Sequence, residues 1–175
     1  MVECELCKLM QNDENLVYKD DKVGVMFNME PSALGEMIVV PLKHEVLFEN
    51  LTDELAAHMA VIANKVSMAQ VAALHCEGTN LLVQSGEQAG QRHAHTFIRV
   101  IPRFDGDGID LSWNPKKLND EEMSVIEIKL RDACQKIFFK AEKKAPQEFK
   151  VSEEHADSKE SEKYKYMLEQ LNRLP

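Results

Sequence analysis

The sequence predicts an α+β domain, because short strand-like segments fill roughly its first 100 residues and two amphipathic helical segments accompany them. The strand-like segments are rich in β-branched residues or alternate in polarity, and turn residues bound them. They are "LVYK" (16–19), "VGVMF" (23–27), "EMIVVP" (36–41), "NLLVQ" (80–84) and residues 94–101. The two aspartates between the first two segments predict a hairpin, so about five strands are expected in all.

The first helix is expected over residues 52–74, with Thr52 as its N-cap. Apolar residues recur along it at helical spacing, so one stripe of the helix is expected to pack on the sheet. Cys76 follows the end of this helix and is predicted to be a small buried residue rather than a nucleophile.

A second helix is expected from Asn119 to about Lys143, because Asn119 and Glu122 form a capping-box pattern. Its apolar face would carry Met123, Ile126, Leu130, Cys134, Ile137 and Phe138. Cys134 is therefore also predicted to be buried.

The composition excludes several classes of protein. A net charge of −9 argues against general nucleic-acid binding, although it allows a local basic pocket for one small anion. No apolar run reaches about 18 residues, so no membrane span is expected. The start "MVECELCKLM" lacks the apolar run of a signal peptide, and a cytoplasmic protein with reduced cysteines is therefore expected.

The composition also predicts two regions. A folded domain is expected over residues 1–143. Residues 144–175 are expected to form a polar linker, followed by a short helical tail at "YKYMLEQLNRL" (164–174).

A metal site is suggested by "CELC", in which Cys4 and Cys7 have the spacing that presents two thiolates to one ion. A structural zinc site takes four ligands, so two more must come from elsewhere in the chain. His44 and His95 are the candidates, with His93 as a rival to His95. The alternative is a pair of reduced cysteines without a metal.

The chain resembles the histidine triad (HIT) family, which binds nucleotides and hydrolyses or transfers nucleotidyl groups. Over about residues 1–143, the family's motifs occur in order as "CELC", "MFNMEPSALGEMIVVPLKH", "LTDEL", "SGEQAGQ", "VIPRFDGDG" and "LSWNPKKLNDEE". The resemblance implies a HIT-like fold, with an antiparallel sheet of about five strands, a packed long helix and a C-terminal helical extension. It also implies a homodimer, and a structural zinc ion held by Cys4, Cys7, His44 and His95.

The catalytic triad of the family departs from its pattern here. Gly90 and Gln91 on one side, and "VIPR" (100–103) on the other, place His95 first, Phe97 second and Arg99 third. The second position belongs to the family's nucleophile, and a phenyl ring has no lone pair to attack phosphorus. The resemblance therefore implies reduced or absent hydrolysis and no catalytic residue in this register. Arg99 remains able to hold a phosphate with a bidentate fork.

The resemblance also implies a phosphate site and a base site. Arg92 stands where a small hydroxyl residue usually helps hold the phosphate, and Asn28 stands where an acid usually contacts the ribose. Gln91 is expected to donate its amide to a phosphate oxygen, and a nucleobase slot is expected beside Met26 and Phe27, with core packing as the alternative for these two. The nucleotide- and phosphate-binding set is Asn28, Gln84, Gly90, Gln91, Arg92 and Arg99.

Three functions follow from these observations. The first is binding of a purine nucleotide, or a related phosphate ligand, with poor or no hydrolysis. The second is an active nucleotide phosphoramidate or dinucleoside polyphosphate hydrolase or transferase, in which the register shifts by two and His93 and His95 take over the first two triad places. The third is a non-catalytic interaction module whose cleft is closed by Phe97.

Overall fold

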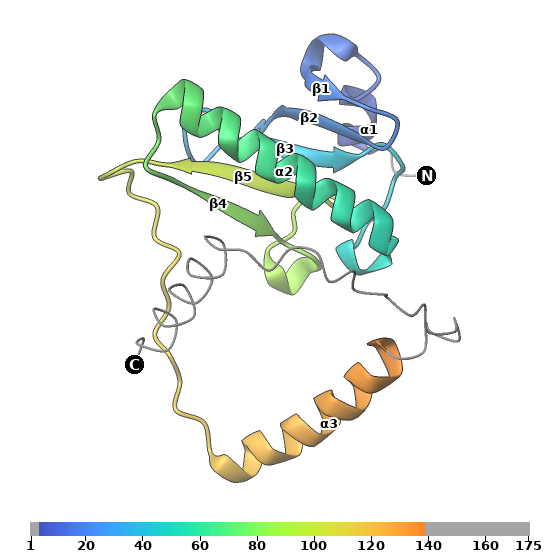
Figure 1. The fold of residues 1–175 in the computed structure, drawn as a ribbon, viewed down its shortest axis with the longest axis vertical. Coiled ribbons are helices and arrows are strands. Elements are labelled where there is room, and N and C mark those ends of the chain that lie inside the picture. Colours follow the sequence, from blue (N-terminus) through green and yellow to red (C-terminus); the bar gives the residue numbers. More distant parts are fainter. Residues whose placement is uncertain (1–3, 139–175) are drawn as a thin grey trace, which may run out of the picture. The chain divides into compact units, whose positions relative to one another are not determined.

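The computed structural model describes residues 4–138. The chain forms two compact units, residues 1–113 and residues 114–175. The first unit contains the five-stranded sheet, and the described part of the second, residues 114–138, contains one long helix (Figure 1). The elements in chain order are α1 (Glu5–Leu9), η1 (Asp13–Asn15), β1 (Leu16–Lys19), β2 (Val23–Phe27), β3 (Met37–Pro41), η2 (Phe48–Asn50), α2 (Asp53–Leu74), β4 (Gly78–Val83), η3 (Glu87–Ala89), β5 (Ile98–Arg103) and α3 (Asp120–Phe138).

The sheet has the strand order β1-β2-β3-β5-β4, and every neighbouring pair is antiparallel. The helix α2 crosses one face of the sheet (Figure 1). Thr52 caps this helix, since its hydroxyl accepts a hydrogen bond from the Leu55 N–H. The α+β fold with about five antiparallel strands and a packed long helix is thus confirmed.

Alternating side chains of the strands form two separate hydrophobic cores, one on each face of the sheet. On the α2 face, Val25 and Val39 pack with Met59 and Ile62 of the helix. On the opposite face, the next residues along the same strands pack against α1. These buried residues are Leu6, Met10, Met26, Ile38 and Val40. The short first helix is therefore anchored to the sheet by its own core.

The fifth strand is shorter at its start than the sequence predicts. It begins at Ile98 rather than at residue 94, so His93 and His95 lie on the connection before the strand and the expected one-face alternation is wrong there. Both neighbouring ladders end at Ile98, which pairs with Val39 on one side and Val83 on the other. Before that point, the Thr96 N–H donates to the Glu45 carbonyl in the loop after β3.

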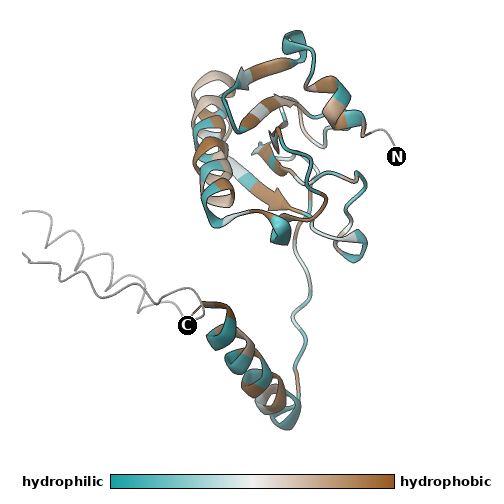
Figure 2. Cartoon of the chain, turned by 90° about the vertical axis from the view of Figure 1, so that its right-hand side faces the viewer, coloured by the Kyte–Doolittle hydropathy of each residue, from teal (hydrophilic) through white to brown (hydrophobic). Residues whose placement is uncertain are grey.

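The second unit consists of α3 within the described residues, and its apolar and polar positions can be followed in Figure 2. None of its described residues is buried, so the prediction that Cys134 is buried is wrong. Cys76, by contrast, is buried as predicted. The expected tail at 164–174 lies outside the described residues, and the boundary at residue 143 stays a prediction. No described helix has both the length and the hydropathy to span a membrane.

Candidate functional site

Two cysteines and two histidines from three distant segments meet beside α1. Cys4 lies at the N-cap of α1 and Cys7 lies within it, so one helical turn brings both sulfurs to the same side. His44 comes from the loop after β3, and His95 from the connection before β5. Their four candidate ligand atoms all lie within 4.8 Å of one another.

The distances in this cluster suit one metal ion. The Nδ1 atom of His95 lies 3.4 Å from the Sγ atoms of both Cys4 and Cys7, and Nδ1 of His44 lies 3.3 Å from Sγ of Cys7. A tetrahedral zinc ion with ordinary bond lengths separates sulfur and nitrogen ligands by about 3.6 Å. The residues present therefore fit zinc in number, type and spacing.

The protonation of His95 fits a ligand as well. Its ring is fully buried, and Nε2 lies 3.0 Å from the carbonyl oxygen of Pro41. A carbonyl only accepts, so Nε2 carries the proton and the lone pair of a neutral ring lies on Nδ1, facing the sulfurs. Burial lowers the pKa of His95, which favours that neutral form.

The Cys7 thiol also suits a site that a cation completes. Burial, together with the neighbouring Cys4, raises the pKa of Cys7 to about 11. Without a cation Cys7 therefore keeps its proton at neutral pH, and a bound metal ion would displace that proton.

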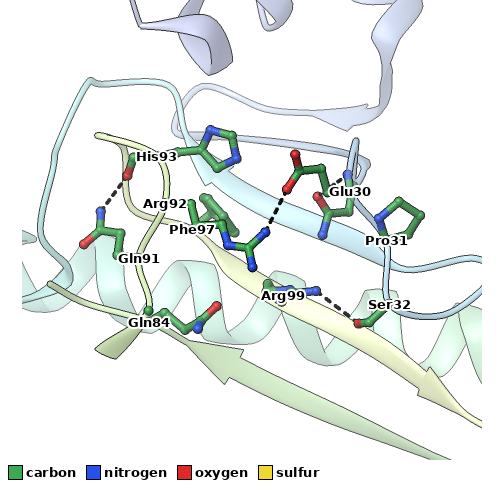
Figure 3. A pocket seen from close by; sticks show the side chains of 11 residues that line it. Glu30, Pro31, Ser32, Gln84, Gln91, Arg92, His93, Phe97 and Arg99 are labelled. Atoms are coloured by element: carbon green, nitrogen blue, oxygen red, sulfur yellow. Dashed lines mark hydrogen bonds and ion pairs between the residues drawn. The ribbon is translucent and has the colours of Figure 1, made fainter. Parts of the chain in front are cut away.

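A pocket of about 380 Å³ lies against the connection that carries His95 (Figure 3). It is lined by Asn28, Glu30, Pro31, Ser32, Gln84, Gly90, Gln91, Arg92, His93, Phe97 and Arg99. All six residues that the sequence assigned to nucleotide and phosphate binding are in this set. Glu30, Pro31 and Ser32 were not anticipated, and neither Met26 nor Phe27 lines the pocket.

The expected base slot is thus not part of this pocket and stays a prediction. Met26 is buried in the core against α1, and Phe27 is exposed. Core packing was the alternative interpretation of Met26 from the sequence, and it accounts for the position of this residue.

The loop before β5 is held together by two glutamines. The Gln91 amide donates to the carbonyls of Val46 and His93, at 2.7 and 2.8 Å, while its Oε1 accepts from the Gly86 N–H at 2.6 Å. Both N–H groups of this amide are thus used within the loop, and the donation of Gln91 to a phosphate stays a prediction. Gln84 donates to the Ala89 carbonyl across the same loop.

The guanidinium of Arg99 faces a carboxylate inside the protein. Its Nε and Nη2 donate to the two oxygens of Glu36, at 2.6 and 3.0 Å, and Nη2 also contacts the Ser32 hydroxyl at 3.1 Å. The fork expected to hold a phosphate is therefore occupied by Glu36. Sequence reasoning missed this partner, which was taken only as the first residue of a strand.

Glu36 accepts hydrogen bonds from several residues that line the pocket. The residue is only 1% exposed, and its carboxylate also accepts from the Asn28 amide at 2.6 Å and from the N–H and hydroxyl of Ser32, both at 2.7 Å. Burial acts to raise the pKa of Glu36, but Arg99, Ser32 and Asn28 together lower it to about 2. One N–H of the Asn28 amide is thus directed at Glu36, and the expected contact of Asn28 with a ribose stays a prediction.

Arg92 and Phe97 remain as predicted pocket residues. Arg92 forms an exposed ion pair with Glu30 across the pocket at 3.3 Å (Figure 3). Phe97 packs in part against the α1 core, and its ring lies 6.0 Å from that of His93. His93 is the one imidazole among the described residues that line the pocket, since His95 turns toward the cysteines.

A family model for the HIT domain matches residues 10–106 of the chain. The chain belongs to the HIT domain family. A HIT-like protein of Borreliella burgdorferi is 30% identical over 125 residues, which cover 69% of this chain and 89% of that protein. The adenylylsulfatase HINT3 of Arabidopsis thaliana is 28% identical over 138 residues, which cover 75% of this chain and 70% of that protein.

The solved structures agree with this HIT assignment. A HIT family protein from Bacillus anthracis matches with a TM-score of 0.68 at 26% identity, over 75% of this chain and 97% of its own. The region that the family model matches contains the pocket residues together with His44 and His95, whereas Cys4 and Cys7 precede it.

Proposed function

We propose that this HIT protein binds a purine nucleotide, or a related phosphate ligand, in the pocket between Asn28 and Arg99, and hydrolyses it poorly or not at all. The observation that carries the proposal is Phe97, which lines the pocket where the triad register places the nucleophile. A phenyl ring cannot form the covalent phosphorus–nitrogen intermediate, and loss of a nucleophile lowers the rate by several orders of magnitude.

We further propose that the cluster of Cys4, Cys7, His44 and His95 holds a structural zinc ion. The support is the approach of the four donor atoms and the tautomer that Pro41 imposes on His95. With all four places taken by protein, such an ion supplies rigidity rather than an open coordination site. We also propose, from the resemblance alone, that the protein is a homodimer.

The relatives support a nucleotide ligand in a general way. The matched Arabidopsis protein is described as an adenylylsulfatase, which makes an adenylylated compound a reasonable first probe for this chain.

The binding proposal is tested by calorimetric titration of the whole protein with AMP. We expect Arg92→Gln to weaken binding about tenfold, because an exposed cation at the pocket contacts the phosphate. Arg131→Gln, on α3 and outside the pocket, removes the same charge and is expected to leave the affinity unchanged. Absence of heat and of thermal stabilisation by AMP in the wild type would instead favour the interaction module.

The active-enzyme alternative retains one supporting observation, since the His93 ring lines the pocket beside Phe97. The role of nucleophile that this alternative gives to His95 is not supported, because the buried His95 ring contacts Pro41 and the cysteines. Turnover that disappears in His93→Ala would favour this alternative.

A further inference from the structure

The charged side chains around the pocket cancel one another. Arg92 faces Glu30 across the pocket, and Arg99 is held bidentately by Glu36 behind it. Two guanidinium groups are thus matched by two carboxylates, and no lysine lies among the described lining residues. The pocket of a protein that binds a multiply charged phosphate is expected to carry an excess of positive charge instead.

The two ion pairs differ in how easily a ligand could separate them. Glu30 and Arg92 are both exposed, with side chains 66% and 80% accessible, so an anion can displace Glu30 at little cost. The Glu36 side chain is inaccessible, and its donors include Asn28, Ser32 and Arg99. Moving Arg99 to a ligand would leave a buried carboxylate without its cation, which is the costly way to break a buried pair.

The geometry of Arg99 leads to the same conclusion. Its Nε and Nη2 form the fork that a phosphate would use, and both already donate to Glu36. Of the three guanidinium nitrogens of Arg99, only Nη1 has no hydrogen-bond partner among the described residues. A ligand phosphate can therefore gain at most a single contact from this side chain, next to a fixed negative charge.

We infer that Glu36 is a specificity-determining residue that occupies the Arg99 fork in place of a ligand phosphate. The pocket therefore selects a nucleoside derivative with at most one negative charge, such as a phosphoramidate or phosphodiester, over nucleoside mono-, di- and triphosphates. This inference rests on the proposed nucleotide function of the pocket.

Calorimetry of the full chain with adenosine 5′-phosphoramidate, AMP and ATP at neutral pH tests the selection. The wild type is expected to bind the singly charged phosphoramidate at least as tightly as AMP, and ATP about tenfold more weakly. In Glu36→Gln, the affinity for AMP relative to the phosphoramidate is expected to rise about tenfold, because Arg99 gains a free positive charge. Glu54→Gln, which removes an exposed carboxylate outside the pocket, is the control and leaves the ratio unchanged.

Two results would overturn the inference: AMP binding more than about tenfold tighter than the phosphoramidate in the wild type, or a ratio unchanged in Glu36→Gln. If Glu36→Gln does not fold, the double variant Glu36→Gln with Arg99→Gln replaces it. That variant removes both charges together and is expected to keep the wild-type ratio. A marked loss of AMP affinity there would show that Arg99 holds the phosphate after all.

Failure of the proposed function is distinguishable from failure of this inference. If neither nucleotide binds the wild type, inorganic phosphate becomes the probe, with thermal stabilisation as the readout. Stronger stabilisation of Glu36→Gln than of Glu54→Gln by phosphate would support the role of Glu36 without any nucleotide. Equal stabilisation of the two variants would contradict it.

Discussion

Glu36 shows how one buried carboxylate can decide what a pocket presents to its ligand. It accepts hydrogen bonds from Asn28, Ser32 and Arg99, so two side chains expected at a ligand, Asn28 and Arg99, are partly turned toward the protein. The sequence could not reveal this contact, because Arg99 lies 63 residues away. The two residues meet only through the pairing of β3 with β5, in which Ile38 lies opposite Arg99.

The same carboxylate predicts a pH-dependent stability. Its folded pKa of about 2 lies below the ordinary value of 4.5, so Glu36 stabilises the fold above pH 4.5 and loses this contribution as the pH falls toward 2. We expect Glu36→Gln to lower the free energy of unfolding most at neutral pH, and progressively less between about pH 4.5 and 2. Urea unfolding across this range measures the difference. A difference that stays constant with pH would contradict the prediction.

At the scale of elements, the turn before β5 determines where the pocket residues lie. The sequence identified the strand by its alternation but extended it to residue 94. Alternation alone cannot show that the ladders with Val39 and Val83 end at Ile98, nor that the Glu45 carbonyl takes the Thr96 N–H. The first two strands were placed correctly because their hairpin is local in sequence.

Gly90 is the residue on which this turn most depends. Its φ is +84°, and a Cβ there would lie 2.6 Å from Nε2 of Gln84. We expect Gly90→Ala to lower the free energy of unfolding by about 1–2 kcal/mol, since a side chain is strained in the left-handed region. The same replacement at Gly78, where a Cβ would meet nothing within 4 Å, is the matched control. Equal effects of the two replacements on urea unfolding would show that the turn is not constrained as described.

At the scale of the molecule, the Cys–His cluster joins the first helix to the loop after β3 and to the connection before β5. Its histidines lie 37 to 91 residues from the cysteines that they contact, so spacing alone justified only the two cysteines. The resemblance to the HIT family indicated the two histidines, and in the structure all four donor atoms lie close together. The fold was predictable from hydrophobic patterning and motif order, whereas the internal pairing of Arg99 was not.

If the proposed zinc ion is bound, its removal is expected to destabilise the whole first unit. With a zinc-selective chelator we expect the melting temperature of the wild type to fall by about 5–10 °C and to recover when zinc is added back. Cys7→Ser is expected to melt low and to respond little to the chelator. Cys134→Ser, at an exposed cysteine of α3, is the control and should behave like the wild type. A wild type whose melting is indifferent to the chelator would exclude a structural metal.

The central claim is that the protein binds its ligand without turning it over. The most direct test measures the release of AMP from adenosine 5′-phosphoramidate by the wild type and by Phe97→His under the same conditions. We predict no release above the uncatalysed rate by the wild type, even at ligand concentrations that saturate the pocket, and measurable release once an imidazole occupies position 97. Sustained release by the wild type that His93→Ala abolishes would contradict the central role assigned to Phe97.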